Sequence, residues 1–271
     1  MSALRGRRIG LIGAGKMGQA LIKGLLAQGM SPKRLSASDA SAAIRRTVTS
    51  RFRISVSEEN RAIARRSDIV ILAVKPQQFA EVVGGLAPVL SRDHLVISIA
   101  AGITLRWLQR RLPGVPVVRV MPNLPATVGC GFAAMTLGRA ARPAHRKIAQ
   151  AIFGGVGEVI ELPERHFDAI TAVSGSGPAY VFFLVRAWEQ AAKSLGLPSA
   201  VARRAILVTL AGGLVLLDES GVSAEELIAR VASKGGTTEA ALKVLAQRHV
   251  AAHVGEALRA AARRSRQLAW S

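Results

Sequence analysis

Short apolar segments alternate with segments of helical periodicity through the first 160 residues of the chain. The runs 68–74 and 94–99 are almost continuously apolar, as expected for parallel strands buried on both faces of a sheet. Apolar residues recur at helical spacing in 19–26, and Gly29 and Pro32 end that helix. We expect strands at 8–12, 34–38, 53–56, 68–74, 94–99, 115–120, 131–136 and 158–161. Strands that alternate with helices predict an α/β fold with a Rossmann-type, doubly wound sheet.

The pattern changes to helices alone after Leu162-Pro163. A capping box from Ser223 to Glu226 starts one of them, and two more follow a break at 233–238. The other helices are expected at 164–172, 178–194 and 199–219. The expected organisation is a dinucleotide-binding domain over 1–162 and an all-α domain over 163–271.

The composition indicates a protein with a substantial core, because half of the residues are apolar. No uninterrupted apolar run reaches the length of a membrane-spanning helix, so we expect a soluble protein without a membrane partner. The N-terminal residues lead directly into the first strand and leave no room for a signal peptide. Cys130 is the single cysteine, which excludes an internal disulfide and is typical of a cytoplasmic protein.

The formal net charge of +20 changes this picture only in part. Such a charge occurs in proteins that bind nucleic acid, anionic surfaces or phosphorylated ligands. However, the arginines are scattered in pairs such as Arg45-Arg46 and Arg203-Arg204, and only 4% of the residues are aromatic. The pattern that stacks nucleic-acid bases is therefore missing, and we interpret the charge as a solvated basic surface. The five histidines show no metal-ligand spacing, so we expect no metal.

A glycine-rich loop stands between the first strand and the first helix, and it consists of Gly13, Ala14, Gly15, Lys16, Met17 and Gly18. In the dinucleotide-binding fingerprint, the first glycine permits a tight turn and the second lets the pyrophosphate approach the backbone. The third glycine permits close packing of the helix. Because the loop has the strand, loop and helix context that this fingerprint requires, we expect these six residues to bind the cofactor.

Asp39 ends the second strand, about 20 residues beyond the glycine loop, where ribose selectivity is decided. An acid at this position accepts hydrogen bonds from the ribose hydroxyls and favours NAD. Small residues with nearby arginines instead accommodate the 2′-phosphate of NADP. Asp39 indicates the first cofactor, whereas Ser38, Ser41, Arg45 and Arg46 indicate the second. We expect Ser38 and Asp39 to border the cofactor and leave its identity open.

Residues 174–180, Ser-Gly-Ser-Gly-Pro-Ala-Tyr, lead into an apolar segment of helical length. Proline is tolerated in a first helical turn, and the glycines before it leave backbone N–H groups accessible to a ligand. A helix start of this kind favours an anion. An ordinary connection between a loop and a helix explains the same residues.

Six segments, spread in order over nearly the whole chain, carry a family resemblance. They are IGLIGAGKMG from Ile9, DIVILAVKPQ from Asp68, SIAAGIT from Ser98, RVMPNLPATVGCG from Arg119, VSGSGPAY from Val173 and SKGGTTEAAL from Ser233. Together they resemble the pyrroline-5-carboxylate reductases, the enzymes of the last step of proline biosynthesis. The last two segments are specific to that family, whereas the glycine loop is not.

The resemblance implies that a hydride passes from NADP(H), or from NAD(H), to C5 of 1-pyrroline-5-carboxylate and yields L-proline. It also implies that the helical domain is a dimerisation domain, intertwined with that of another copy in a homodimer or a larger ring. Reduction of an iminium requires no nucleophile and no metal, because the protein has only to position the hydride donor and the substrate. The expected partners are a small molecule and further copies of the chain.

The resemblance also implies the site residues. The cofactor would be held by the glycine loop, by Asn60 at the adenosine ribose, and by Ala73, Val74, Lys75, Pro76, Met121, Pro122 and Asn123. The substrate pocket would have one wall formed by Ser176, Gly177 and Pro178 and another formed by Ser233, Gly236, Thr237 and Thr238. Thr238 is the expected catalytic contact to the imine.

Three residues depart from the family pattern. Leu124 replaces the threonine of MPNTPA, Lys234 replaces the proline of SPGGTT, and Ala40 stands where an arginine is frequent. The first two leave open a related reductase of the same architecture that acts on a different cyclic imine or keto acid. The charge leaves open a non-catalytic protein that binds a dinucleotide or nucleic acid, although such a protein would have no use for residues 235–238.

Overall fold

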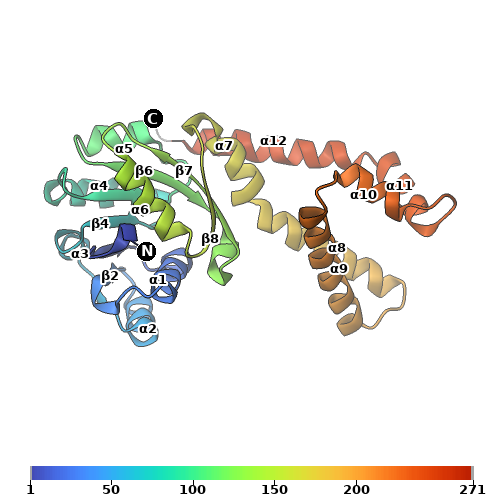
Figure 1. The fold of residues 1–271 in the computed structure, drawn as a ribbon, viewed down its shortest axis with the longest axis horizontal. Coiled ribbons are helices and arrows are strands. Elements are labelled where there is room, and N and C mark those ends of the chain that lie inside the picture. Colours follow the sequence, from blue (N-terminus) through green and yellow to red (C-terminus); the bar gives the residue numbers. More distant parts are fainter. Residues whose placement is uncertain (1, 270–271) are drawn as a thin grey trace. The chain divides into compact units, whose positions relative to one another are not determined.

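The computed structural model describes residues 2–269, which belong to two compact units. The first unit contains the chain up to Ser176 together with the residues from Ala261 onward, and the second contains Gly177–Ala260. All strands of the described residues lie in the first unit (Figure 1). The expected domain boundary between residues 162 and 163 lies upstream of this division and stays a prediction.

The first unit is built around one sheet of eight strands in the order β3-β2-β1-β4-β5-β6-β7-β8. β6 and β7 are antiparallel, and the other neighbouring strands are parallel. The order changes direction between β1 and β4, where open sheets of this kind bind ligands at the carboxyl ends of the strands. The strands are β1 Ile9–Ile12, β2 Leu35–Ser38, β3 Ser55–Ser57, β4 Ile69–Leu72, β5 Leu95–Ser98, β6 Val117–Pro122, β7 Gly131–Leu137 and β8 Gly157–Glu161.

Helices cover both faces of this sheet, because successive side chains of a buried strand point to opposite faces. In β4, Ile69 and Ile71 belong to one buried cluster, and Val70 and Leu72 belong to the other. The first cluster includes side chains of α1 (Lys16–Ala27), α2 (Ala42–Phe52) and α6 (Pro143–Phe153). The second includes side chains of α3 (Asn60–Arg65), α4 (Phe79–Leu86) and α5 (Leu105–Arg111). The doubly wound architecture is therefore confirmed.

Two helices of the first unit, α2 and α4, are not predicted by the sequence. α2 buries only Val48 and Phe52, so its apolar periodicity is weak. In α4 the buried Phe79, Val83 and Leu86 have helical spacing, but the adjacent Gly84-Gly85 hides it. Both helices follow strands whose carboxyl ends form the candidate site.

The expected helix over 164–172 is divided into η6 (Glu164–His166), α7 (Phe167–Ile170) and a π-helical turn, η7 (Thr171–Gly175). The hydroxyl of Ser265, near the end of α12 (Val250–Leu268), donates a hydrogen bond to Asp168 at 2.7 Å. This bond joins the end of α12 to α7 within the first unit. The remaining 3₁₀ helices are η1 Ser2–Leu4, η2 Pro32–Arg34, η3 Pro76–Gln78, η4 Ala87–Val89 and η5 Leu124–Val128.

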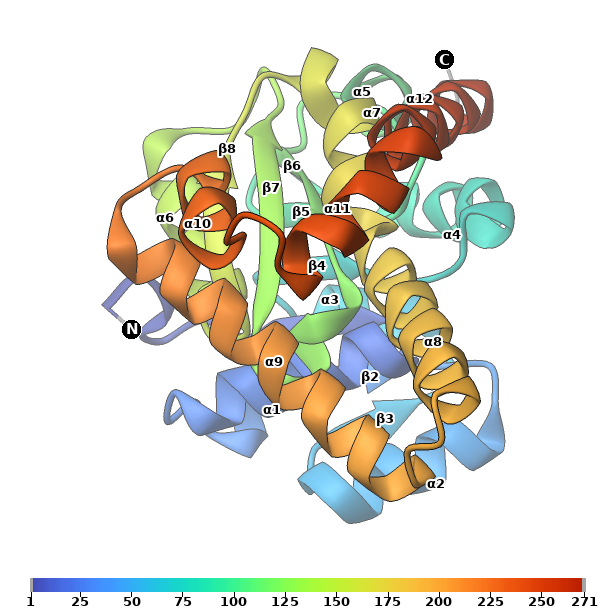
Figure 2. The same ribbon diagram turned by 90° about the vertical axis from the view of Figure 1, so that its right-hand side faces the viewer.

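The second unit consists of helices and their connections (Figure 2). They are α8 Gly177–Ser194, α9 Ser199–Ser220, α10 Ala224–Val231, α11 Thr237–Gln247 and the greater part of α12. α8 and α9 pack against each other. At the expected capping box, Ser223 accepts a hydrogen bond from the Glu226 N–H at 3.2 Å, and α10 begins there. The helices expected after residue 177 are confirmed.

Within this unit, α8 and α9 expose large apolar side chains, among them Phe182, Phe183 and Leu214. The segments Glu164–Ser194 and Ser199–Ser220 are long and apolar enough to cross a membrane, judged by length and composition alone. The expectation of a protein without a membrane partner therefore stays a prediction. Exposed apolar side chains gathered in this way are typical of a site that contacts another protein or a membrane.

Candidate active site

A pocket of about 330 Å³ lies at the carboxyl ends of β1, β2 and β4. This is the point where the strand order changes direction, so the topology alone favours a ligand site here. The pocket brings together many of the predicted cofactor residues: Gly13, Gly15, Ser38, Asp39, Asn60, Ala73, Val74 and Lys75. Ala14, Lys16, Met17 and Gly18 belong to the same loop and the first turns of α1, and Pro76 begins η3.

The three glycines of the loop differ in what a side chain at each position would contact. Gly13 has a φ of +95°, and a Cβ there would lie 2.8 Å from the Ala73 carbonyl carbon. A Cβ on Gly18 would lie 2.6 Å from the Gly13 oxygen, so the third glycine lets α1 pack against the loop. At Gly15, by contrast, a Cβ would have no described atom within 4 Å.

Gly15 therefore faces open space at the N-terminus of α1, where no side chain caps the helix. Neither the backbone turn nor packing within the described chain explains this glycine. A dinucleotide pyrophosphate that approaches the backbone explains it, and the dipole of α1 favours the negative charge. The loop thus fits the cofactor that the sequence predicts.

The residues at the end of β2 line the pocket beside the glycine loop. The Asp39 carboxylate accepts hydrogen bonds from the Ala14 N–H and the Ser41 N–H, each at 2.9 Å. The buried Ser38 hydroxyl donates to Asn60 Oδ1 at 2.7 Å, which fixes the first residue of α3 against β2. These bonds hold Ser38, Asp39 and Asn60 in place beside the glycine loop.

Sequence reasoning missed several residues that line this pocket. They are Ala40, Ile44, Gln78, Glu81 and Val82. Ile44 lies on α2, while Glu81 and Val82 lie on α4, the two helices that the sequence does not predict. The spacing of Phe79, Val83 and Leu86 is the signal that could have identified α4 and the lining residues beside it.

The predicted nicotinamide residues Met121, Pro122 and Asn123 lie at the end of β6. The Asn123 amide donates to Ser174 Oγ at 3.1 Å and accepts from the Phe132 N–H at 2.9 Å. A Cβ on Gly175 would lie 2.6 Å from the Met121 methyl carbon, so the π-helical turn packs closely against the end of β6.

Ser176, a predicted substrate residue, directly follows the π-helical turn. That turn contacts the predicted nicotinamide residues. The Ser176 N–H donates to the Thr171 carbonyl at 2.8 Å, which closes the turn. π-helical turns are rare and are frequently found at functional sites. The role of Ser174 as the partner of Asn123 could not be read from the sequence, because 51 residues separate the two.

The other predicted substrate residues belong to the second unit. Gly177 and Pro178 form the first turn of α8, and Gly236 is the N-cap of α11, which begins at Thr237. Gly235 has a φ of +74°, so this turn requires a glycine. A Cβ on Gly236 would lie 2.5 Å from the Ser233 hydroxyl. The two glycines therefore allow the tight loop that leads into the start of α11.

Thr238 is half-buried in the first turn of α11. The Gly235 N–H donates to the Glu239 carboxylate, a contact that the sequence does not reveal. Residues 233–238 belong to the second unit, and Ser176 and Met121 belong to the first. Their meeting in one substrate pocket stays a prediction, as do the individual roles of the site residues.

Of the residues that depart from the family pattern, Leu124 is 44% exposed and Lys234 is exposed. Cys130 is an exposed free thiol. Within residues 2–269 no three side chains of His, Cys, Asp or Glu are gathered so that they could hold a metal ion. The expectation of a metal-free site stays a prediction.

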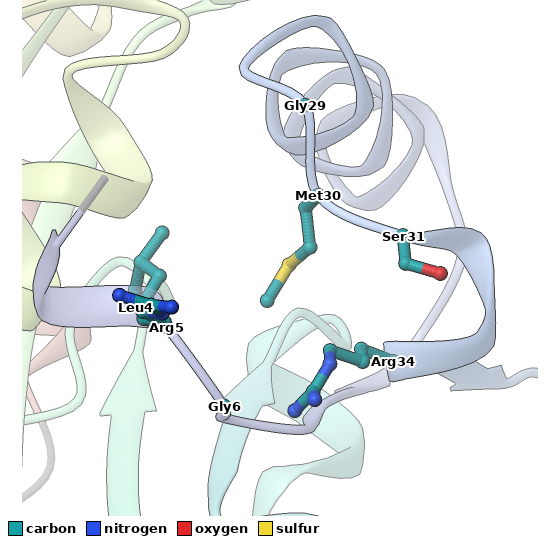
Figure 3. A pocket seen from close by; sticks show the side chains of 7 residues that line it. All are labelled: Leu4, Arg5, Gly6, Gly29, Met30, Ser31 and Arg34. Atoms are coloured by element: carbon teal, nitrogen blue, oxygen red, sulfur yellow. The ribbon is translucent and has the colours of Figure 1, made fainter.

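A second pocket, of about 450 Å³, contains none of the predicted site residues (Figure 3). Met30 and Arg34 precede β2, and Leu4 and Arg5 precede β1, so the pocket lies at the amino ends of these strands. Figure 3 shows the Met30 side chain between Leu4 and Arg34. Because ligands of such sheets bind at the carboxyl ends, this pocket is not the candidate site.

Comparison with known proteins agrees with this geometry. The family model for pyrroline-5-carboxylate reductase dimerisation matches residues 164–268, and the model for NADP oxidoreductase, coenzyme F420-dependent, matches residues 8–102. The pyrroline-5-carboxylate reductase of Pseudomonas aeruginosa is 41% identical over 264 residues, which are 97% of either chain. This chain belongs to the pyrroline-5-carboxylate reductase family.

Solved structures of pyrroline-5-carboxylate reductases have the same fold. The Coxiella burnetii structure has a TM-score of 0.90 and 33% identity and covers 98% of this chain and 99% of its own. The Plasmodium falciparum structure, with NADP bound, has a TM-score of 0.90 and 27% identity over the same shares of the two chains. The family and the fold class predicted from the sequence, a Rossmann-type domain followed by a helical dimerisation domain, are confirmed.

Proposed function

We propose that this chain reduces the C=N bond of 1-pyrroline-5-carboxylate with hydride from NAD(P)H and yields L-proline, the last step of proline biosynthesis. The observation that carries the proposal is the 41% identity with the Pseudomonas aeruginosa enzyme over 97% of the chain. A relation over this length includes the glycine loop as well as residues 233–238. The open space at Gly15, which suits a dinucleotide pyrophosphate, supports the same function independently of the comparison.

The pocket at the carboxyl ends of β1, β2 and β4 receives the cofactor. Residues 13–18 hold the pyrophosphate, and Ser38, Asp39 and Asn60 border the adenosine ribose. Ala73, Val74, Lys75 and Pro76 line the path from there toward Met121, Pro122 and Asn123 at the nicotinamide. When bound, the dinucleotide supplies the hydride.

The residues of this chain contribute position rather than covalent chemistry, since a protonated imine accepts hydride without a nucleophile. The start of α11 offers backbone N–H groups and a positive dipole end to the substrate carboxylate. Because the Gly235 N–H already bonds to Glu239 and the Gly236 N–H to the Ser233 carbonyl, the substrate uses N–H groups of the first turn of α11. Thr238 contacts the ring nitrogen, and Ser176, Gly177 and Pro178 form the opposite wall.

A second copy of the chain covers the exposed apolar side chains of α8 and α9 and completes the active site in a homodimer or larger homo-oligomer. The match of the dimerisation family model to residues 164–268 supports this assembly, and its start beside residue 163 supports the proposed domain boundary. The protein acts in the cytoplasm, which its single cysteine supports.

Steady-state oxidation of NADH and of NADPH in the presence of 1-pyrroline-5-carboxylate tests the proposal. We expect turnover with this substrate and much less with a six-membered-ring imine or a keto acid. A preference for the six-membered ring would assign the chain to the related reductases, with Leu124 and Lys234 as the first residues to exchange. No oxidation of either cofactor, together with salt-sensitive DNA binding, would contradict the proposal.

Replacement of Gly15 by alanine tests the glycine loop. Its backbone (φ −67°, ψ −167°) suits alanine, and the new Cβ meets no described atom, so the fold should be as stable as before. The methyl group would occupy the space of the pyrophosphate, and overpacking of this kind costs roughly 1–3 kcal/mol. We therefore expect the affinity for the cofactor to fall about fivefold to 150-fold.

Calorimetric titration with NADH and NADPH measures the affinity, and thermal unfolding checks the fold. Gly84→Ala is the matched control, because Gly84 on α4 also has no described atom within 4 Å of its Cβ position, yet it does not line the pocket. Equal affinities of Gly15→Ala and Gly84→Ala would show that the pyrophosphate lies elsewhere.

Replacement of Thr238 by alanine tests the predicted contact to the imine. A hydrogen bond to a charged group contributes about 1.5–3 kcal/mol, so its loss should lower kcat about tenfold or more. Cofactor affinity should change less, since Thr238 is not among the predicted cofactor residues. Thr238→Ser, which retains the hydroxyl, should recover most of the turnover. Unchanged kinetics of Thr238→Ala would remove Thr238 from the mechanism.

A further inference from the structure

The carboxylate of Asp39 is fixed at the mouth of the cofactor pocket by two backbone donors. One oxygen accepts from the Ala14 N–H of the glycine loop and the other from the Ser41 N–H, each at 2.9 Å. The backbone of Asp39 is held as well, since its N–H donates to the Ser57 carbonyl at 3.2 Å. Asp39 is half-buried and lines the pocket. Its side chain therefore has a defined place beside the loop that holds the pyrophosphate.

These two hydrogen bonds orient the Asp39 carboxylate and leave some of its acceptor positions free. An ionised carboxylate has about four acceptor positions on its two oxygens, and the backbone uses two of them. The other positions remain for donors that enter the pocket. The 2′- and 3′-hydroxyls of an unmodified adenosine ribose are such donors.

Arg45, the arginine beside Asp39, is occupied by other partners. Its guanidinium donates to the carbonyl oxygens of Asp39 at 2.9 Å and Ala40 at 2.8 Å. It also forms an ion pair with Glu58 at 2.9 Å. The guanidinium thus ties the β2–α2 connection to the residues after β3, and its charge is balanced by Glu58. It is not poised as a receptor for a phosphate.

The charged side chains that line the pocket do not offer a cation at the ribose end either. Among the described residues these are Asp39, Lys75 and Glu81. Lys75 follows β4, whereas the ribose end is formed by the residues after β2. Arg46 is exposed on α2 and does not line the pocket. A 2′-phosphate would therefore meet a carboxylate and no balancing charge at this end.

We infer that this chain binds NADH in preference to NADPH, with Asp39 as the residue that determines the choice and Arg45 as a positioning residue. The 2′-phosphate of NADPH carries a charge of about −1.5 to −2 at neutral pH, and like charges in contact are strongly unfavourable. The inference rests on the proposed function, because it concerns the cofactor of that reaction. It also resolves the ambiguity of the sequence, in which Arg45 and Asp39 indicate opposite cofactors.

Direct binding of the two reduced cofactors to the full-length protein, without substrate, tests this inference. We expect NADH to bind at least about tenfold more tightly than NADPH. Equal affinities, or tighter binding of NADPH, would overturn the inference and leave the proposed reductase function intact. Binding of neither cofactor would overturn both.

Two variants test the roles of the residues through the ratio of the NADH and NADPH affinities. Asp39→Asn should reduce this ratio about tenfold, because it removes the charge that repels the phosphate. A merely structural role of Asp39 in holding the loop would lower both affinities by the same factor. An unchanged ratio would therefore overturn the assignment, even if the variant binds both cofactors weakly.

Glu58→Gln removes the partner of Arg45 while Asp39 remains. The freed guanidinium should raise the affinity for NADPH about threefold, the scale of an exposed ion pair, and leave the affinity for NADH unchanged. Glu226→Gln is the matched control, since Glu226 pairs with Arg230 at 2.8 Å on α10 and should alter neither affinity. A Glu58→Gln ratio equal to that of the control would overturn the view that the ion pair with Glu58 keeps Arg45 from a 2′-phosphate.

Discussion

Glu164→Ala should lower the free energy of unfolding by about 3–5 kcal/mol, because it leaves a buried arginine without its counter-ion. Arg119 lies on β6, and its side chain is only 6% exposed. Glu164 accepts from the Arg119 guanidinium at 2.7 Å and from the Leu105 N–H at 2.7 Å. The guanidinium also lies over the Phe167 ring, 4.6 Å from its centre. One carboxylate therefore joins β6, the start of α5 and η6.

Urea unfolding at a fixed protein concentration measures this loss, because assembly makes stability depend on concentration. Glu161→Ala is the matched control: Glu161 pairs with Arg146 at 2.6 Å, but both side chains are about 40% exposed, so the cost should stay below about 1 kcal/mol. A double variant, Arg119→Met with Glu164→Leu, should recover much of the loss. Equal losses in Glu164→Ala and Glu161→Ala would contradict the prediction.

This ion pair also shows where sequence reasoning about the fold ends. The strands could be predicted because runs such as 69–74 are apolar without interruption, a pattern typical of a strand covered on both faces. The partner of Arg119, in contrast, is 45 residues away along the chain. Pairings over such distances depend on how helices and strands pack, so no local sequence pattern indicates that Glu164 is the partner of Arg119.

In the candidate site, too, some features could be predicted from the sequence and others could not. The glycine loop could be predicted, since its glycines stand between a strand and a helix and the positive φ of Gly13 is a local requirement. The orientation of Asp39 could not, because it depends on the Ala14 N–H, which lies 25 residues earlier. Gln78 and Glu81 were missed together with α4, whose apolar face is interrupted by Gly84-Gly85.

The exposed face of α9 has a regular pattern that indicates what covers it. Val201, Val208 and Val215 recur every seven residues, and Leu207 and Leu214 repeat with the same period beside them. All five side chains are exposed in the single chain, and Leu214 reaches 64%. A seven-residue apolar repeat is the pattern of helices that pack along each other. Gly212 and Gly213 have no described atom near them, so another helix could approach closely.

Val208→Glu combined with Leu214→Glu should therefore dissociate the proposed oligomer into monomers. Two carboxylates buried without partners are costly, and we expect the dissociation constant of self-association to rise at least about 100-fold, which corresponds to roughly 2.7 kcal/mol. Turnover should fall together with assembly, because the proposed active site is complete only in the oligomer. The helix itself should persist, since glutamate is a good helix former.

Sedimentation equilibrium measures the mass of the assembly, and circular dichroism checks that the helices remain. Thr49→Glu, an exposed position on α2, introduces the same charge away from the apolar face and should leave mass and turnover unchanged. If the double variant keeps the mass of the unaltered protein, the repeat on α9 is not the contact between copies. Flotation of the unaltered protein with lipid vesicles would instead assign the apolar faces of α8 and α9 to a membrane, which their length and composition also permit.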